Sequence, residues 1–248
     1  MRKFFLEEMN IHTGGKYLLS KDDSYHVITV LRHNINQEEI IICDGNGHNF
    51  HAKVTNHYQH LAEVTIMDEI DMDHEPAVDV HLYMSLIKAE KFEMALQKCA
   101  EVGVREITPM LTERTIIKVD DSKEDRKVER WNKIVQEACK QSNRSYIPSV
   151  NKPMKFNECL SRNNNNMIIA YVEENQHNLK ECLSQIESDT IQLLIGPEGG
   201  FSPSEIKRAK DHHVMTTHLG SLILRAETAA IVATSLILFH KEQMDEKH

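Results

Sequence analysis

The pattern of hydrophobic and polar positions changes near residue 75. Before that point, short apolar runs alternate with polar residues, as in 39–43 and 50–54, and 61–66 reads as a further strand. Residues 44–47 (Asp-Gly-Asn-Gly) are a strong hairpin signal because these residues tolerate the backbone angles of tight turns. A helix capped at Ser20 is expected to run to about Arg32. We therefore predict a small β-barrel over residues 1–72.

After a polar, charged segment at 71–76, which reads as a linker, strand and helix patterns alternate. This alternation predicts a second domain over residues 73–248, an α/β domain with a mostly parallel sheet and helices on both faces. Strands are expected at 78–86, 107–110, 167–172 and 191–195, and helices at 91–102, around 131–138, at 179–186, 204–212 and 227–239. The last helix is apolar nearly all round and is therefore expected to be buried.

Composition restricts the class of protein. The chain has 248 residues, of which 40% are hydrophobic and 27% charged, as expected for a soluble globular protein, and it has no apolar run long enough to span a membrane. The apolar run at the N-terminus is too short for a signal peptide. Five cysteines, odd in number and without a C-x-x-C pair, suit a reducing cytoplasm and argue against a zinc site or a disulfide framework.

The net charge of −9 argues against broad, non-specific binding of nucleic acid, which needs a basic surface. Residues 1–72 carry 6 Lys and Arg against 11 Asp and Glu, so this part cannot act as a general basic clamp. The mixed-sign run at 120–130 reads as a solvated helix face or a mobile loop.

The stretch from Thr190 to Thr228 carries the strongest functional signal. Its apolar run breaks into residues 196–200 (Gly-Pro-Glu-Gly-Gly), and a second loop follows at Leu219-Gly220. Glycines let a ligand approach the backbone, and ligands of open α/β sheets bind beyond the carboxyl ends of the strands. Two such loops are suited to clamp a flat ligand such as an adenine. The alternative is that the first loop is only a tight strand-to-helix turn.

The chain lacks G-x-G-x-x-G and G-x-x-x-x-G-K-[ST]. Their absence argues against a dinucleotide-binding Rossmann domain, a P-loop NTPase and an ordinary Rossmann-type methyltransferase.

The two loop motifs, Leu194 to Ser202 and Leu219 to Ala229, resemble the signature of the RsmE family. These are the 16S ribosomal RNA (uracil(1498)-N(3))-methyltransferases of the SPOUT superfamily. The resemblance spans nearly the whole chain. It includes Phe4-Phe5, His26 and Val30 to Arg32, then Lys88, Lys91, Glu93, Gln97-Lys98 and Glu101 to Val104, then Trp131, Ile134, Glu137-Ala138, Gln141-Ser142, Arg144 and Ile147-Pro148. Two mild departures are Ala226 and Thr115, where the family more usually has threonine and serine.

The resemblance implies an N-terminal PUA-like barrel and a C-terminal methyltransferase domain with a deep trefoil knot. It also implies S-adenosyl-L-methionine as cofactor, N3 of one uridine in small-subunit ribosomal RNA as the target, and a homodimer. On this basis the apolar last helix is expected at the dimer interface.

Methylation at uracil N3 requires loss of the N3 proton, which a carboxylate can accept while a guanidinium stabilises the developing anion. Glu198, Arg225 and Arg144 are the candidate catalytic residues. Each also has a structural alternative: Glu198 as the residue that holds its own loop, Arg225 as the ion-pair partner of Glu227, and Arg144 as an ordinary solvated residue. The predicted cofactor-binding residues are Leu194, Ile195, Gly196, Pro197, Glu198, Gly199, Gly200, Leu219, Gly220, Ile223, Leu224 and Arg225.

Candidate RNA contacts are the cations Arg2, Lys3, Arg32, Lys88, Arg114 and Arg144. No metal site is expected, because the adjacent His212 and His213 point apart on a helix. Two other functions stay open: a knotted RNA methyltransferase with another target base, and a non-catalytic RNA-binding protein of ribosome assembly.

Overall fold

The structure is a computed structural model that describes residues 2–6, 8, 10–32, 35, 37–72, 75–117 and 121–241. The chain divides into two compact units. Unit 1 is Met1–Glu75 with Cys139–Ile147, and unit 2 is Pro76–Ala138 with Pro148–His248. The expected boundary falls beside Asp73 and His74, which lie outside the described residues. The inclusion of residues 139–147 in unit 1 differs from the expectation of two continuous segments, because hydrophobic periodicity does not report contacts between distant parts of a chain.

Unit 1 is built on a five-stranded sheet of order β1-β3-β4-β5-β2. Only the β1–β3 pair is parallel. The predicted hairpin joins β3 to β4, and its turn is closed by the Asp44 carboxylate, which accepts from the Asn46 amide at 2.8 Å. The strands are β1 (Lys3–Phe5), β2 (Lys16–Leu18), β3 (Glu39–Cys43), β4 (Asn49–Tyr58) and β5 (Leu61–Ile70).

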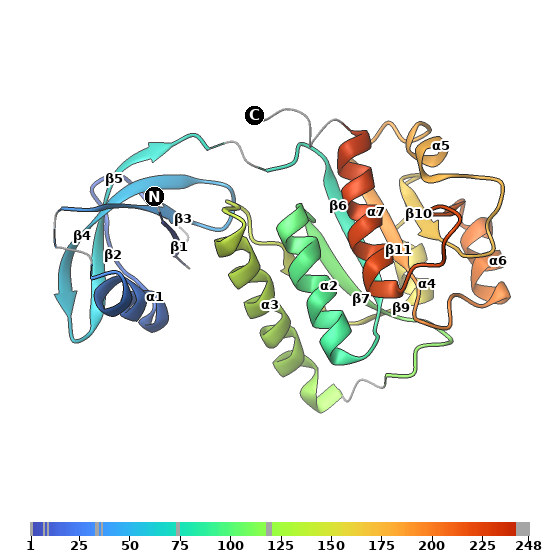
Figure 1. Ribbon diagram of the computed structural model, residues 1–248, viewed down its shortest axis with the longest axis horizontal. Helices are drawn as coiled ribbons and strands as arrows, with labels where there is room; N and C mark the ends of the chain where they lie inside the picture. The colour runs from blue at the N-terminus through green and yellow to red at the C-terminus, as the bar shows by residue number, and fades with distance from the viewer. Residues whose placement is uncertain are drawn as a thin grey trace. The chain divides into compact units, whose positions relative to one another are not determined.

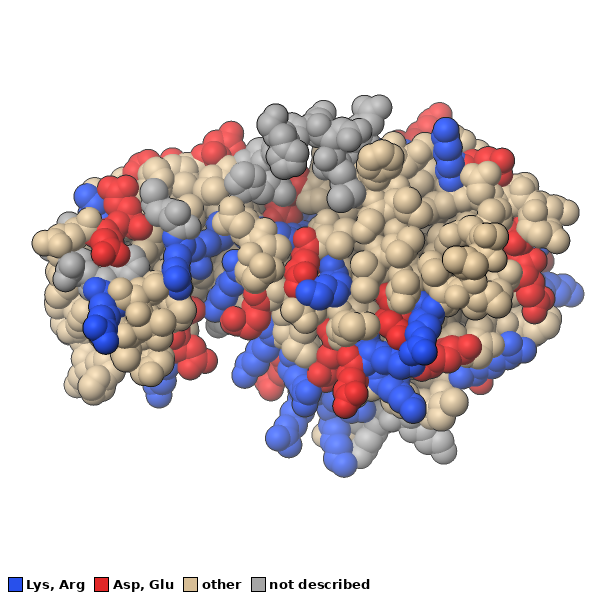
Figure 2. Space-filling model, viewed as in Figure 1, with Lys and Arg blue, Asp and Glu red and all other residues tan. Residues whose placement is uncertain are grey.

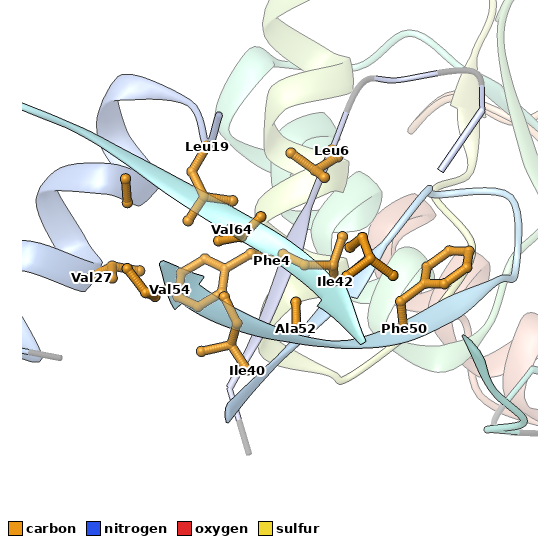
Figure 3. Packing of buried hydrophobic residues seen from close by; sticks show 12 residues of the cluster. Phe4, Leu6, Leu19, Val27, Ile40, Ile42, Phe50, Ala52, Val54 and Val64 are labelled. Atoms are coloured by element: carbon orange, nitrogen blue, oxygen red, sulfur yellow. The ribbon is translucent and has the colours of Figure 1, made fainter. Parts of the chain in front are cut away.

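The predicted helix begins where expected, since the Ser20 hydroxyl accepts from the Asp23 amide at 3.1 Å. It consists of α1 (Lys21–Tyr25) continued by a π-helical turn, η1 (His26–Val30). Figure 3 shows the core that these elements enclose, in which inward-facing side chains of the strands meet Leu19 and Val27. Alternate positions of β3 and β4, such as Ile40, Ile42 and Val54, are fully buried, so the period-2 pattern of the sequence describes this core.

Unit 2 is built on a sheet of order β12-β10-β11-β6-β7-β8, with β9 also paired to β7, and every pair is parallel. The predicted parallel sheet is therefore confirmed. Its strands are β6 (Asp79–Ser85), β7 (Glu106–Leu111), β8 (Ser149–Val150), β9 (Met154–Lys155), β10 (Met167–Ala170), β11 (Thr190–Ile195) and β12 (Met215–Thr217). The short strands β2, β8 and β9 were not predicted, because two or three residues carry no measurable period.

Helices cover both faces of this sheet (Figure 1). Tyr83 and Leu194 face α4 and α6, while α7 packs on α2 and on the opposite face of β6 and β11. Helix α2 ends at Gly103, whose φ of 126° favours glycine at a helix end. The helices are α2 (Ala89–Val102), α3 (Glu124–Gln141, preceded by the 3₁₀ turn η2, Asp121–Lys123), α4 (Phe156–Leu160), α5 (Leu179–Leu183), α6 (Pro203–Asp211) and α7 (Ala226–His240).

Candidate functional site

Three loops of unit 2 meet at one edge of the sheet. Strands β12, β10 and β11 are parallel neighbours, so their carboxyl ends lie side by side. The chain leaves β11 through residues 196–202, leaves β12 through 218–225 and leaves β10 through 171–173. This edge is where α/β sheets bind ligands.

The three loops enclose a cavity of about 510 Å³. Its wall is formed by residues 170–173, 195–201 and 218–226, together with Arg114 and Ala229. This volume is within the range of small-molecule and cofactor sites. Much of the wall is glycine-rich main chain, so its amide and carbonyl groups can contact a ligand directly.

The glycines of these loops have distinct roles. Gly200 and Gly220 have φ of 67° and 115°, a region that other residues rarely adopt. A Cβ at Gly196 would lie 2.9 Å from the ring of Phe201, which is buried, so that position has no room for a side chain. A Cβ at Gly199 would lie 3.5 Å from Arg114, at ordinary contact distance. The sequence motif therefore encodes both the turn and the open main chain.

Arg114 was predicted as an RNA contact, and the structure brings it to the cavity wall. Its guanidinium donates to the carbonyl oxygen of Gly199 at 2.7 Å. The turn that carries it is held by Glu205, a fully buried carboxylate on α6. Glu205 accepts from the amide of Glu113 at 2.8 Å and from the amide of Ser202 at 2.9 Å, so it joins the turn after β7 to the loop after β11.

The neighbouring carboxylate, Glu113, strengthens this junction. Hydrogen bonds from Ser202, Arg208 and Ser204 lower the pKa of Glu113 to about 2. The Arg208 guanidinium lies 2.7 Å from its carboxylate. Sequence reasoning noted Glu205 only as a residue that accompanies the motif at 194–202 and gave it no separate role. Its position three residues after Ser202, the capping-box spacing, was the signal for its local role, but nothing in the sequence indicated the contact with Glu113.

Replacing Glu205 by alanine is expected to lower the free energy of unfolding by about 3 kcal/mol, because two amide donors lose a fully buried acceptor. Glu158 is the matched control, since it is exposed and holds the same capping-box position on α4. Glu158→Ala is expected to cost only about 0.5–1 kcal/mol. Urea denaturation of both variants measures the difference. Equal losses would show that Glu205 acts only as a helix cap.

Two of the three candidate catalytic residues line the cavity. Arg225 is exposed and occupies the N-cap of α7, and Glu198 lies in the loop after β11. Lys91 of α2 lies 3.6 Å from the Glu198 carboxylate and 4.0 Å from that of Glu227. Glu227 is 4% exposed, and its second oxygen has no hydrogen-bond partner among the described residues. Lys91 therefore ties the loop of Glu198 to the first turn of α7.

Arg144, the third candidate, is not among the residues that line the cavity and belongs to unit 1. Its side chain is 5% exposed, and its guanidinium donates to Glu75 at 2.7 and 3.0 Å. Burial raises the pKa of the Glu75 carboxyl, but the hydrogen bonds and charge of Arg144 and the amides of Tyr146 and Ser145 outweigh burial, so the pKa is lowered. The structure thus shows Arg144 in a buried ion pair with Glu75, and it is not one of the residues that line the cavity.

The structure also corrects the expectation for Lys3. Its residue is only 7% exposed, and its ammonium donates to the carbonyls of Asn143 and Arg144 and to the hydroxyl of Ser145. Burial lowers the pKa of Lys3. With its three donors used inside unit 1, Lys3 holds the 139–147 segment and has none to offer to RNA.

The remaining expectations divide by exposure. Arg2, Arg32 and Lys88 are exposed, as an RNA contact requires.

Leu194 does not line the cavity, because its side chain points into the core beside Tyr83 and Phe201. All the other predicted cofactor-binding residues line the cavity. Sequence reasoning missed the loop after β10, where Tyr171 donates to Glu173 at 2.6 Å, because it carries no recognisable motif.

Two further observations concern the described part of the chain. Within the described ranges, no three His, Cys, Asp or Glu side chains are grouped as metal ligands. The helices there include none that is both long and apolar enough to cross a bilayer.

Comparison with known proteins defines the class. Residues 74–238 match the family model of the RNA methyltransferase domain, so unit 2 carries the fold and loops of an RNA methyltransferase. The chain is 32% identical to ribosomal RNA small subunit methyltransferase E of Buchnera aphidicola subsp. Acyrthosiphon pisum, over 89% of this chain and 87% of that protein. It is 28% identical to the protein of that name from Bacillus subtilis, over 98% of both chains. The chain belongs to the ribosomal RNA small subunit methyltransferase E family.

Solved structures agree with this assignment. The Neisseria gonorrhoeae ribosomal RNA small subunit methyltransferase E, crystallised with S-adenosyl methionine, is 30% identical over 96% of this chain and 97% of that chain, with a TM-score of 0.86. A Legionella pneumophila protein whose structure holds the bound cofactor has a TM-score of 0.84 and 30% identity, over 95% of this chain and 96% of that chain. The α/β architecture expected from the sequence is therefore confirmed.

Proposed function

We propose that the protein transfers a methyl group from S-adenosylmethionine to N3 of a uridine in the 16S ribosomal RNA of the small subunit. One observation carries the proposal. In a chain of this family, a cavity of cofactor size lies between two glycine-rich loops, with Arg225 and Glu198 on its wall.

The residues at the cavity fit S-adenosylmethionine. The cofactor is held by the main chain of 195–200 and 219–224, where the glycines leave the amides and carbonyls accessible. Arg114 and the loop after β10 close the remaining sides. When bound, the cofactor supplies an electrophilic methyl group on a positively charged sulfur.

The chain's own residues then handle the uracil. Arg225 donates to a carbonyl oxygen next to N3 and stabilises the negative charge that spreads onto it as the N3 proton leaves. Glu198 would accept that proton, directly or through water, and so would leave N3 able to take the methyl group that the cofactor supplies. Lys91, 3.6 Å from the Glu198 carboxylate, pairs with it at the wall of the cavity.

The finer fold assignment forms part of the proposal. Unit 2 is assigned as a SPOUT domain with a trefoil knot, and unit 1 as a PUA-like barrel that contacts RNA, with the division near residues 72–73. The five-stranded sheet of unit 1 and the loop-bounded cavity of unit 2 support this assignment. Arg2, Arg32 and Lys88 are the exposed cations proposed for RNA contact.

A homodimer in the cytoplasm, where ribosomal subunits are made, is also proposed. Helix α7 leaves Leu236 and Phe239 exposed by 43% and 55%, and Leu222 and Ile223 in the preceding loop are exposed by 79% and 81%. Large apolar side chains exposed near both ends of α7 favour a protein partner, and a second copy is the proposed one. Sedimentation should give a dimer for the wild type and a monomer for Leu236→Glu/Phe239→Glu. A monomeric wild type would overturn this part.

The reaction is tested by mapping modified nucleosides in 16S ribosomal RNA from a strain that lacks the gene. One 3-methyluridine is expected to be missing, and to return with the wild-type gene but not with Arg225→Gln. Loss of a different methylated nucleoside would move the target to another base. An unchanged modification pattern would favour a non-catalytic role.

A further inference from the structure

Five cations lie on one side of the first three turns of α3 and the 3₁₀ turn before it. They are spaced by three or four residues, which places them on one helical face. These residues, here called the basic stripe, are Lys123, Arg126, Lys127, Arg130 and Lys133. The stripe spans about 15 Å along the helix axis at 1.5 Å per residue. It ends before Glu137, which lies on the same face one turn later.

The acidic residues of this segment lie elsewhere around the helix. Asp125 and Glu129 project to a neighbouring side, and Glu124 projects toward the side of the buried Trp131. Lys152, from outside the helix, lies 2.7 Å from the Asp125 carboxylate and 3.9 Å from that of Glu124. Lys152 therefore offsets, from another element, one of the two negative charges of this pair. The mixed-sign run of the sequence is sorted by the helix into separate faces.

The stripe is accessible. Arg126, Arg130 and Lys133 are exposed, and Lys127 is partly exposed. Arg130 pairs with Glu93 of α2 at 2.8 Å, yet its side chain remains 68% exposed. Among the residues that the structure describes, Arg126, Lys127 and Lys133 form no ion pair. Figure 2 shows lysine and arginine side chains gathered where the N-terminal half of α3 lies in Figure 1.

We infer that the basic stripe of α3 binds the phosphate backbone of the substrate RNA. This inference rests on the proposed function, since it assigns a binding surface to that substrate. A row of cations about 15 Å long on one helix face matches a row of phosphates, and phosphate contacts position a nucleic acid on a protein surface. It also explains how a chain with a net charge of −9 holds a polyanion: the positive charge is concentrated on one face.

The test removes three charges from the stripe and leaves Arg130 to its contact with α2. The variant is Arg126→Gln/Lys127→Gln/Lys133→Gln. The matched control, Lys180→Gln/Lys207→Gln/Lys210→Gln, removes three charges from exposed positions on α5 and α6 of the same unit. Binding of transcribed 16S ribosomal RNA and of unmodified small subunits is measured by filter binding over a range of salt concentrations. Binding of S-adenosylmethionine is measured by calorimetry.

The stripe variant is expected to bind RNA about tenfold more weakly than the control. Its plot of log K against log salt should flatten by about 2, because each phosphate contact contributes about 0.7–0.9 to the slope. Its affinity for S-adenosylmethionine and its kcat at saturating RNA should match the control. Equal RNA affinity and equal slope in the two variants would overturn the inference.

Two other outcomes would overturn the inference for different reasons: the stripe binds an acidic protein, or the proposed substrate is wrong. If the stripe variant loses affinity for the assembled subunit but keeps the control's affinity and slope on naked RNA, the face binds an acidic protein instead, and the RNA assignment is overturned. If the wild type binds S-adenosylmethionine but neither binds nor methylates ribosomal RNA, the proposed substrate is wrong, and the inference is overturned with it. The second failure is seen in the wild type, whereas failure of the inference alone is seen only in the comparison of variants.

Discussion

Replacing Gly199 by valine is expected to weaken binding of S-adenosylmethionine at least 100-fold, or about 2.7 kcal/mol. Gly199 lines the cavity, and a Cβ at this position would lie 3.5 and 3.6 Å from the side chain of Arg114. The two further carbons of valine must then displace Arg114, which donates to the Gly199 carbonyl, or enter the space of the cofactor. Calorimetric titration measures the loss.

Gly199→Ala is the graded control for this variant. Its single added carbon stands at ordinary contact distance, so a loss of about tenfold or less is expected. Both variants should unfold within a few degrees of the wild type, because the backbone of residue 199 is outside the left-handed region. Wild-type affinity in Gly199→Val would place the cofactor away from this loop.

Replacing Arg225 by glutamine is expected to lower kcat by about 10²–10³-fold, the effect of removing one donor that stabilises a developing anion. The affinity for S-adenosylmethionine should change by no more than about threefold, because the main chain of the loops provides most of the cofactor contacts in this account. Arg225→Lys should recover only part of the activity, since lysine keeps the charge but not the planar pair of donors. Single-turnover methylation of 16S ribosomal RNA measures these rates.

Lys210→Gln, which removes an exposed cation far along α6 from its N-terminus, is the matched control and should keep the wild-type rate. An unchanged kcat in Arg225→Gln with a large rise in KM for the cofactor would make Arg225 a cofactor ligand and not a stabiliser of the uracil anion.

Most of the fold could be predicted from the sequence because its signals are local. The period-2 pattern of β4 and the apolar runs of β3 and β11 give strands whose burial follows the pattern. The cap at Ser20 and the stop at Gly103 give helix ends. The assignment of residues 139–147 to unit 1 was not predictable, because it depends on contacts of Lys3, Glu75 and Cys43 with a segment about 70 to 140 positions away.

The candidate site, like the fold, could be predicted only where its signals are local in the sequence. The loops at 196–200 and 219–225 were found because glycine-rich main chain after a strand is a local signal for ligand binding. Arg114 reaches the cavity from a different strand through Glu205, and Arg144 pairs with Glu75 within unit 1. Those outcomes depend on ion pairs and hydrogen bonds between distant residues, which a single sequence does not contain. The basic stripe follows from helical spacing, whereas the contact of Lys152 with Asp125 and Glu124 does not.

The central claim is tested most directly by incubating the purified protein with unmodified small subunits and S-adenosylmethionine that carries a trideuterated methyl group. Nucleosides from the 16S ribosomal RNA are then separated, and their masses are measured by mass spectrometry. The account predicts one 3-methyluridine per RNA, three mass units heavier than the natural nucleoside, and none with Arg225→Gln over the same time. Label in any other nucleoside, or no label from a protein that binds the cofactor, would contradict it.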